Sequence, residues 1–142
     1  MTFPRTSARH QLLFHHEVLH ALLRRLADAA ERSAQGKGSA QELRDAARSL
    51  HLVMEAHAAR EERLLEPVLS RKSPQRLEEL RRGHRRALEM LRALGARPLA
   101  EAAAGYRQAV PVLVAAIERE GREILESAQP PAHRADATWT TA

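Results

Sequence analysis

Apolar residues recur every three or four positions along four segments of this chain, and short breaks separate the segments. Such spacing is typical of helices that bury one face. Gly36 and Gly38 make the first break, and Ser39 and Ser73 stand where helix N-caps are expected. The predicted helices cover residues 7–33, 39–69, 74–95 and 98–127. Joined by short connections, they predict an all-α fold, an antiparallel up-down-up-down four-helix bundle.

The composition fits a single domain of this kind. The chain has 142 residues, of which 44% are hydrophobic and 29% charged, and this excludes a disordered polar tract. Charged residues interrupt every helical stretch, so no apolar run reaches the roughly 18 residues that cross a bilayer. We therefore expect a bundle over residues 1–127, no membrane partner, and a loose tail over residues 128–142.

Several chemistries are excluded by what the sequence lacks. It contains no cysteine, so it has no disulfide framework and no thiol nucleophile. It also lacks a glycine-rich phosphate loop and a Gly-x-Ser-x-Gly motif, so it shows no motif of a classical enzyme. The missing cysteines and the lack of an apolar core in the first ten residues favour a cytoplasmic location.

Polar residues interrupt the apolar face of the second predicted helix. His57 lies on the face marked by Leu50 and Met54, and Glu61 follows one turn later on the same face. A carboxylate in a bundle core is costly unless it is paired or bound to a metal. The alternative is a surface His–Glu pair, which is common at this spacing and is favoured when the motif is taken alone.

The same interruption occurs on the other three helices. His16 and His84 lie between leucines, and Glu120 lies between Ile117 and Ile124. A lone histidine on an apolar face is usually a core residue, but these positions share a further property. In an up-down-up-down bundle, early positions on odd helices and late positions on even helices lie at one level, and all five polar residues agree within about one turn. The set therefore predicts a site for a divalent first-row metal ion.

The two halves of the chain resemble each other. HHEVLHALLRRL is similar to GHRRALEMLRAL, and HAAREERLLE is similar to AIEREGREIL. The two helix pairs therefore look like copies of one hairpin. In the second copy Glu120 matches Glu61, but Ala116 stands where the first copy has His57.

The segment HAAREERLLEPVL, together with His16, His84 and Glu120, resembles the hemerythrin-like cation-binding family, also called the HHE domain, over Arg9 to Ser127. This resemblance implies a four-helix bundle with a carboxylate-bridged pair of irons at one end. It also implies a module that binds or senses oxygen or another small diatomic, responds to redox state, or handles iron. Weak peroxide or oxygen chemistry at the iron is the one activity it leaves open.

The resemblance implies five metal ligands in this chain, namely His16, His57, Glu61, His84 and Glu120. One ion would take the first two histidines, a second ion only the third, and the two carboxylates would bridge them. Because Ala116 replaces a histidine of the family pattern, the second ion lacks an imidazole. One tightly held ion, a labile pair and a complete loss of metal all stay open. Imidazole and carboxylate suit iron, manganese or zinc.

Other histidines and carboxylates are weaker candidates. His20 lies one turn after His16 and could be an extra ligand, although a ferritin-like site would need a second Glu-x-x-His motif that the sequence lacks. His15 and His51 fall off the core faces and are expected in solvent. Glu62 is also expected at the surface.

Two alternatives from other classes of function remain. The chain carries a net charge of +5, and arginines crowd the third predicted helix, which would suit nucleic acid or an acidic partner. Glutamates dilute that run and no aromatic residue accompanies it for base stacking, so we do not expect nucleic acid to bind. The other alternative is a metal-free structural bundle that oligomerises. The sequence leaves the oligomeric state open.

Overall fold

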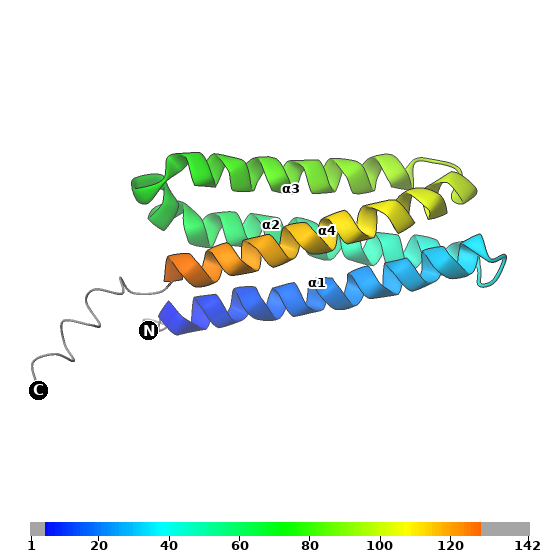
Figure 1. Ribbon diagram of the computed structural model, residues 1–142, viewed down its shortest axis with the longest axis horizontal. Coiled ribbons are helices and arrows are strands. Elements are labelled where there is room, and N and C mark those ends of the chain that lie inside the picture. The colour runs from blue at the N-terminus through cyan, green and yellow to red at the C-terminus, as the bar shows by residue number, and fades with distance from the viewer. Residues whose placement is uncertain (1–4, 129–142) are drawn as a thin grey trace, which may run out of the picture.

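The computed structural model describes residues 5–128 and consists of four antiparallel helices (Figure 1). The helices are α1 (Arg5–Ala34), α2 (Ala40–Lys72), α3 (Pro74–Gly95) and α4 (Leu99–Ala128). Helix α1 packs against α2 and α4, and α3 packs against the same two neighbours. The predicted all-α, up-down-up-down four-helix bundle is therefore confirmed.

The predicted loose tail, apart from Ala128 at the end of α4, lies outside the described residues. The boundary of the domain at residue 127 stays a prediction. Within residues 5–128, no helix has both the length and the apolar content that crossing a membrane requires.

The breaks between helices follow from local chemistry. Gly36 and Gly38 adopt φ angles of 71° and 76°, which cost little only for glycine. The Ser39 hydroxyl accepts a hydrogen bond from the Glu42 backbone N–H at 3.1 Å and so caps α2 as predicted. Ser73 differs from the expectation, because its side chain makes no capping hydrogen bond and only its carbonyl bonds to the first turn of α3.

The apolar core fills the half of the bundle that contains the α1–α2 and α3–α4 turns. Its largest fully buried side chains are leucines, and each contributes about 1.5–3 kcal/mol by leaving water. These residues are Leu19, Leu23, Leu26, Leu43 and Leu50. Toward the other end the same interior holds polar groups, and Glu61 is as fully buried as any leucine. That half of the bundle positions the candidate site.

Candidate metal centre

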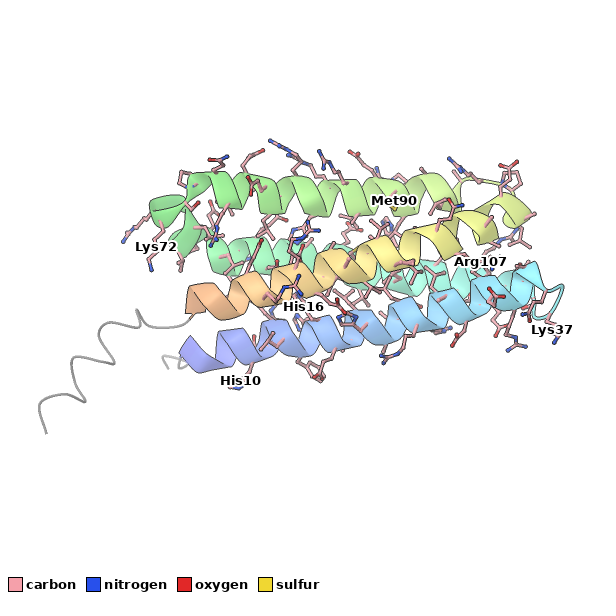
Figure 2. All side chains as sticks on the ribbon, in the orientation of Figure 1. His10, His16, Lys37, Lys72, Met90 and Arg107 are labelled. Atoms are coloured by element: carbon pink, nitrogen blue, oxygen red, sulfur yellow. The ribbon has the colours of Figure 1, made fainter. Side chains whose placement is uncertain are left out.

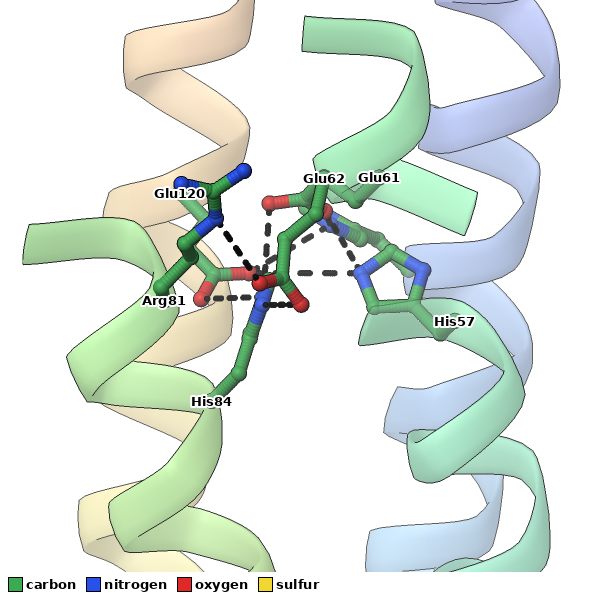
Figure 3. Close-up of polar contacts among 7 residues, drawn as sticks. His57, Glu61, Glu62, Arg81, His84 and Glu120 are labelled. Carbon is green, nitrogen blue, oxygen red and sulfur yellow. Dashed lines mark hydrogen bonds and ion pairs between the residues drawn. The ribbon is translucent and has the colours of Figure 1, made fainter. Parts of the chain in front are cut away.

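Glu61 lies at the centre of a buried group of imidazoles. Its side chain has no exposed surface, and its Oε2 lies 2.6 Å from His57 Nε2 and 3.3 Å from His16 Nε2. Its other oxygen, Oε1, lies 3.6 Å from His84 Nε2 (Figure 3). One carboxylate from α2 therefore touches histidines from α1, α2 and α3.

Glu120 approaches the same three imidazoles from α4. Its Oε1 lies 3.3 Å from His84 Nε2, and its Oε2 lies 3.9 Å from His16 Nε2 and 4.0 Å from His57 Nε2. One potential ligand atom from each of His16, His57, Glu61 and Glu120 lies within 4.8 Å of the others. His84 completes the group through its contacts with both carboxylates. The structure thus brings all five predicted residues together, one or two from each helix.

The polar atoms of this group are not satisfied by one another. Both ring nitrogens of His57, Nε2 of His84 and Oε1 of Glu61 are buried and have no hydrogen-bond partner among the described residues. The short His57–Glu61 contact does not have hydrogen-bond geometry. Buried polar atoms without partners are rare and call for an explanation such as an ion. A donor set of imidazoles and carboxylates fits a divalent first-row metal.

The electrostatics of the centre point in the same direction. Burial lowers the pKa of His57, but contacts with Glu120 and Glu61 and their negative charge outweigh it and raise the pKa to about 9. The same opposition raises the pKa of His84 to about 10. Burial raises the pKa of Glu61, but the surrounding histidines bring it well below its usual range. The centre therefore attracts positive charge, as protons or as a metal ion.

Glu62 contacts the second ring nitrogen of His84. Its Oε2 lies 3.3 Å from His84 Nδ1, whereas Glu61 and Glu120 contact the other ring nitrogen, and its Oε1 lies 3.6 Å from Arg81 Nε (Figure 3). Glu62 was expected at the surface and not as a ligand; its side chain is partly exposed and lies outside the group of close ligand atoms, but it also contacts a site histidine. A carboxylate on the second nitrogen of a ligand histidine fixes its orientation and tautomer.

Gly121 makes room for His16. A Cβ atom built on Gly121 would lie 3.3 Å from His16 Nδ1, which is tighter than an ordinary contact. This glycine was not among the predicted site residues. The sequence does contain a signal for it: Gly121 is an isolated glycine within a helical segment, directly after a candidate ligand, and glycine at such a position lowers the stability of a helix.

The remaining histidines are placed differently. His15 is partly exposed, as expected off the core face, but its ring centroid lies 6.0 Å from that of His57. Burial, Arg60 and the neighbouring histidines lower its pKa. His20, the suggested extra ligand, is not part of the group of close ligand atoms. His51 pairs with Glu55 at 3.6 Å, away from the centre.

A small cavity adjoins the two carboxylates. Its volume is about 20 Å³, enough for about one water-sized molecule. Leu65, Leu69 and Leu80 supply its apolar wall, next to Glu61 and Glu120. The centre therefore has space beside it for a very small ligand.

The fold and the site together define the class of protein: a four-helix bundle with a buried centre of histidines and carboxylates. Residues 7–127 match the family model of the Hemerythrin HHE cation binding domain, and the chain belongs to this family. The family resemblance predicted from the sequence is thereby confirmed. No curated protein and no solved structure matches the chain. Members of the family bind metal, typically iron, and are generally binding modules without catalytic activity.

Proposed function

We propose that this protein binds iron through His16, His57, Glu61, His84 and Glu120, and binds or senses oxygen or another small diatomic there. The observation that carries this proposal is Glu61, a fully buried carboxylate in contact with three imidazoles. Leaving that group without a cation would strand several buried polar atoms. The family match supports the metal, and manganese or zinc would suit the same ligands.

The two carboxylates are suited to bridge two ions. In Glu61, Oε2 faces His16 and His57 while Oε1 faces His84. In Glu120, Oε2 again lies toward the first two histidines and Oε1 toward the third. This division supports a first metal position with two imidazoles and a second with one.

Ala116 accounts for the weakness of the second position. It is partly buried on α4, one turn before Glu120, and offers no ligand atom. We propose that the first ion is held tightly and that the second is labile or absent.

The size of the cavity beside the centre favours a very small ligand. When bound, iron supplies the redox chemistry that recognition of oxygen or nitric oxide requires. The residues of the chain would limit the ligand by size: the small cavity beside Glu61 and Glu120 admits only a very small molecule, and Leu65, Leu69 and Leu80 give it an apolar side. We infer a binding or sensing role without turnover, and the cytoplasmic location remains a prediction.

The nucleic-acid alternative gains no support from the basic run of α3. Arg81 pairs with Glu62 and Glu66, and Arg85 pairs with Glu78, so part of this positive charge is neutralised within the bundle. Exposed pairs of this kind are weak, but they reduce the charge offered to a polyanion.

Elemental analysis combined with optical spectra tests the proposal. The protein is purified without a His-tag, loaded with ferrous salt, and measured in air, after reduction, and under nitric oxide. We expect about one tightly held iron per chain and a spectrum that changes with the gas. Iron that binds without any spectral response to oxygen or nitric oxide would contradict the sensing role, and no iron would contradict the whole proposal.

A further inference from the structure

A second, larger cavity lies in the opposite half of the bundle. Its volume is about 560 Å³, within the usual range for small-molecule sites, and α2, α3 and α4 line it. Figure 2 labels Met90 and Arg107, which directly neighbour the lining residues Leu91 and Tyr106, in the half away from His16. Its lining residue nearest to the centre on α2 is Leu52, which precedes His57 by about 8 Å along the helix. The two sites are therefore separate.

The floor of this cavity is apolar. Leu43, Leu91, Ala102 and Tyr106 line it, and each is a buried residue of the core. The Tyr106 hydroxyl has no hydrogen-bond partner among residues 10–123, and it lies beside Gly95, another lining residue. The floor thus offers apolar surface and one free hydroxyl.

Four arginines surround the floor. Arg44 and Arg48 lie one turn apart on α2, Arg92 lies on α3, and Arg97 lies in the turn that follows. No residue of the described chain forms an ion pair with any of them, whereas arginines elsewhere, such as Arg32 and Arg107, do have acidic partners. No acidic side chain lines the cavity. The positive charge around it is therefore uncompensated.

We propose that this cavity binds a small amphiphile with an apolar body and an anionic head group. The apolar body would cover the leucines and the Tyr106 ring, which gain by leaving water. A carboxylate or phosphate head would meet the guanidinium groups of Arg48 and Arg92, which bind such oxyanions in pairs of hydrogen bonds. Charge complementarity selects an anion over a neutral or cationic molecule of the same shape.

Binding of decanoate to the full-length protein tests this site, with decanol as a neutral probe of equal chain length. We expect saturable, one-to-one binding of decanoate by titration calorimetry, much weaker binding of decanol, and a decanoate affinity that falls with added salt. The variant Arg48→Gln/Arg92→Gln should lower the affinity for decanoate by about tenfold and leave the affinity for decanol unchanged.

The matched control is Arg24→Gln/Arg25→Gln, which removes the same charge from exposed positions on α1. It should leave decanoate affinity unchanged, and all variants should keep the same metal content. An equal loss of decanoate affinity in both double variants would show that the effect comes from net charge alone, and it would overturn the proposed site.

A cavity-filling variant provides a second test. Ala47 lines the cavity and is partly buried, so Ala47→Phe should abolish decanoate binding while helical content is retained. Unchanged binding in this variant, or no saturable binding to the native protein, would overturn the proposal. If the native protein does not bind decanoate but forms a dimer that Ala47→Phe disrupts, the cavity belongs to an interface with a second copy of the chain. That result would overturn the proposal as well.

Discussion

Glu61 and Glu120 come from opposite hairpins of the bundle and divide their oxygens in the same way. Each directs Oε2 toward His16 and His57 and Oε1 toward His84. Each of the two similar halves of the sequence thus contributes one carboxylate to the centre, and the two carboxylates are oriented alike. The histidine one turn earlier is not repeated, since the second hairpin has Ala116 where the first has His57.

Removal of a central ligand should remove the metal. We expect His57→Ala and Glu61→Gln each to lose most of the bound iron, because each removes one of the ligand atoms proposed for the first ion. Elemental analysis after gel filtration measures this. His20→Ala is the control. This variant should keep its iron, because His20 lies outside the group of close ligand atoms. Equal metal contents in all three variants would reject the centre.

Restoring the missing imidazole should strengthen the second position. Ala116→His places a ring one turn before Glu120, as His57 stands one turn before Glu61, and should raise the iron content toward two per chain. Ala115→His is the matched control. Because Ala115 is exposed, this variant should leave the iron content unchanged. Metal analysis and the optical spectrum report the change. A content that stays at the native value would show that the second position is lost for another reason.

The carboxylate behind His84 should tune the affinity of the centre. Glu62→Gln removes the charge beside His84 Nδ1 and should weaken metal binding by about tenfold or more. Competition with a chelator measures the affinity. Glu66→Gln is the control, because Glu66 pairs with the same Arg81 but is exposed. If both variants bind equally well, Glu62 has no role in positioning His84.

The glycine beside His16 should be intolerant of a larger residue. Gly121→Ala brings a methyl group within 3.3 Å of His16 Nδ1, so we expect a shifted ring and a several-fold loss of metal affinity. Gly83→Ala is the control, since nothing lies within 4 Å of its Cβ. That control should gain up to about 1 kcal/mol of helix stability and keep its metal. A fully metal-competent Gly121→Ala protein would contradict the packing argument.

The pH dependence of the metal-free protein follows from the raised pKa values of His57 and His84. Both are protonated in the folded state to a higher pH than in the unfolded state, where the reference is 6.5. Their stabilising contribution is therefore complete below pH 6.5 and lost as the pH rises through about 9 and 10. Urea unfolding in chelator should show this decline in the free energy of unfolding. The variant His57→Gln/His84→Gln should show a shallower decline, and profiles of equal slope would contradict the assignment.

The helices could be predicted because their signals are local. Periodic leucines and the Gly36–Gly38 break were sufficient, and each helix end lies within three residues of its prediction. The extension of α2 to Lys72 was not predicted. Pro67 lies within that helix on its exposed side, where water can bond the carbonyl that the proline leaves free. The missing side-chain cap of Ser73 depends on a rotamer, which sequence does not determine.

The five central residues could be predicted because helix length and direction place them at one level. Residues around them could not, because their roles depend on the rotation of neighbouring helices. Glu62 follows Glu61 directly and would leave the core face of an isolated helix, yet α3 approaches closely enough for His84 to meet it. Gly121 has no side chain to indicate a contact, and His15 reaches His57 only because α1 and α2 pack side by side.

An anomalous difference map at the iron edge, from crystals of the iron-loaded native protein, tests the central claim most directly. We expect a strong peak in contact with Glu61, His16 and His57, and a weaker peak or none beside His84. A map without any peak inside the bundle, with these side chains still gathered as described, would contradict it. A peak bound only at surface carboxylates would do so equally.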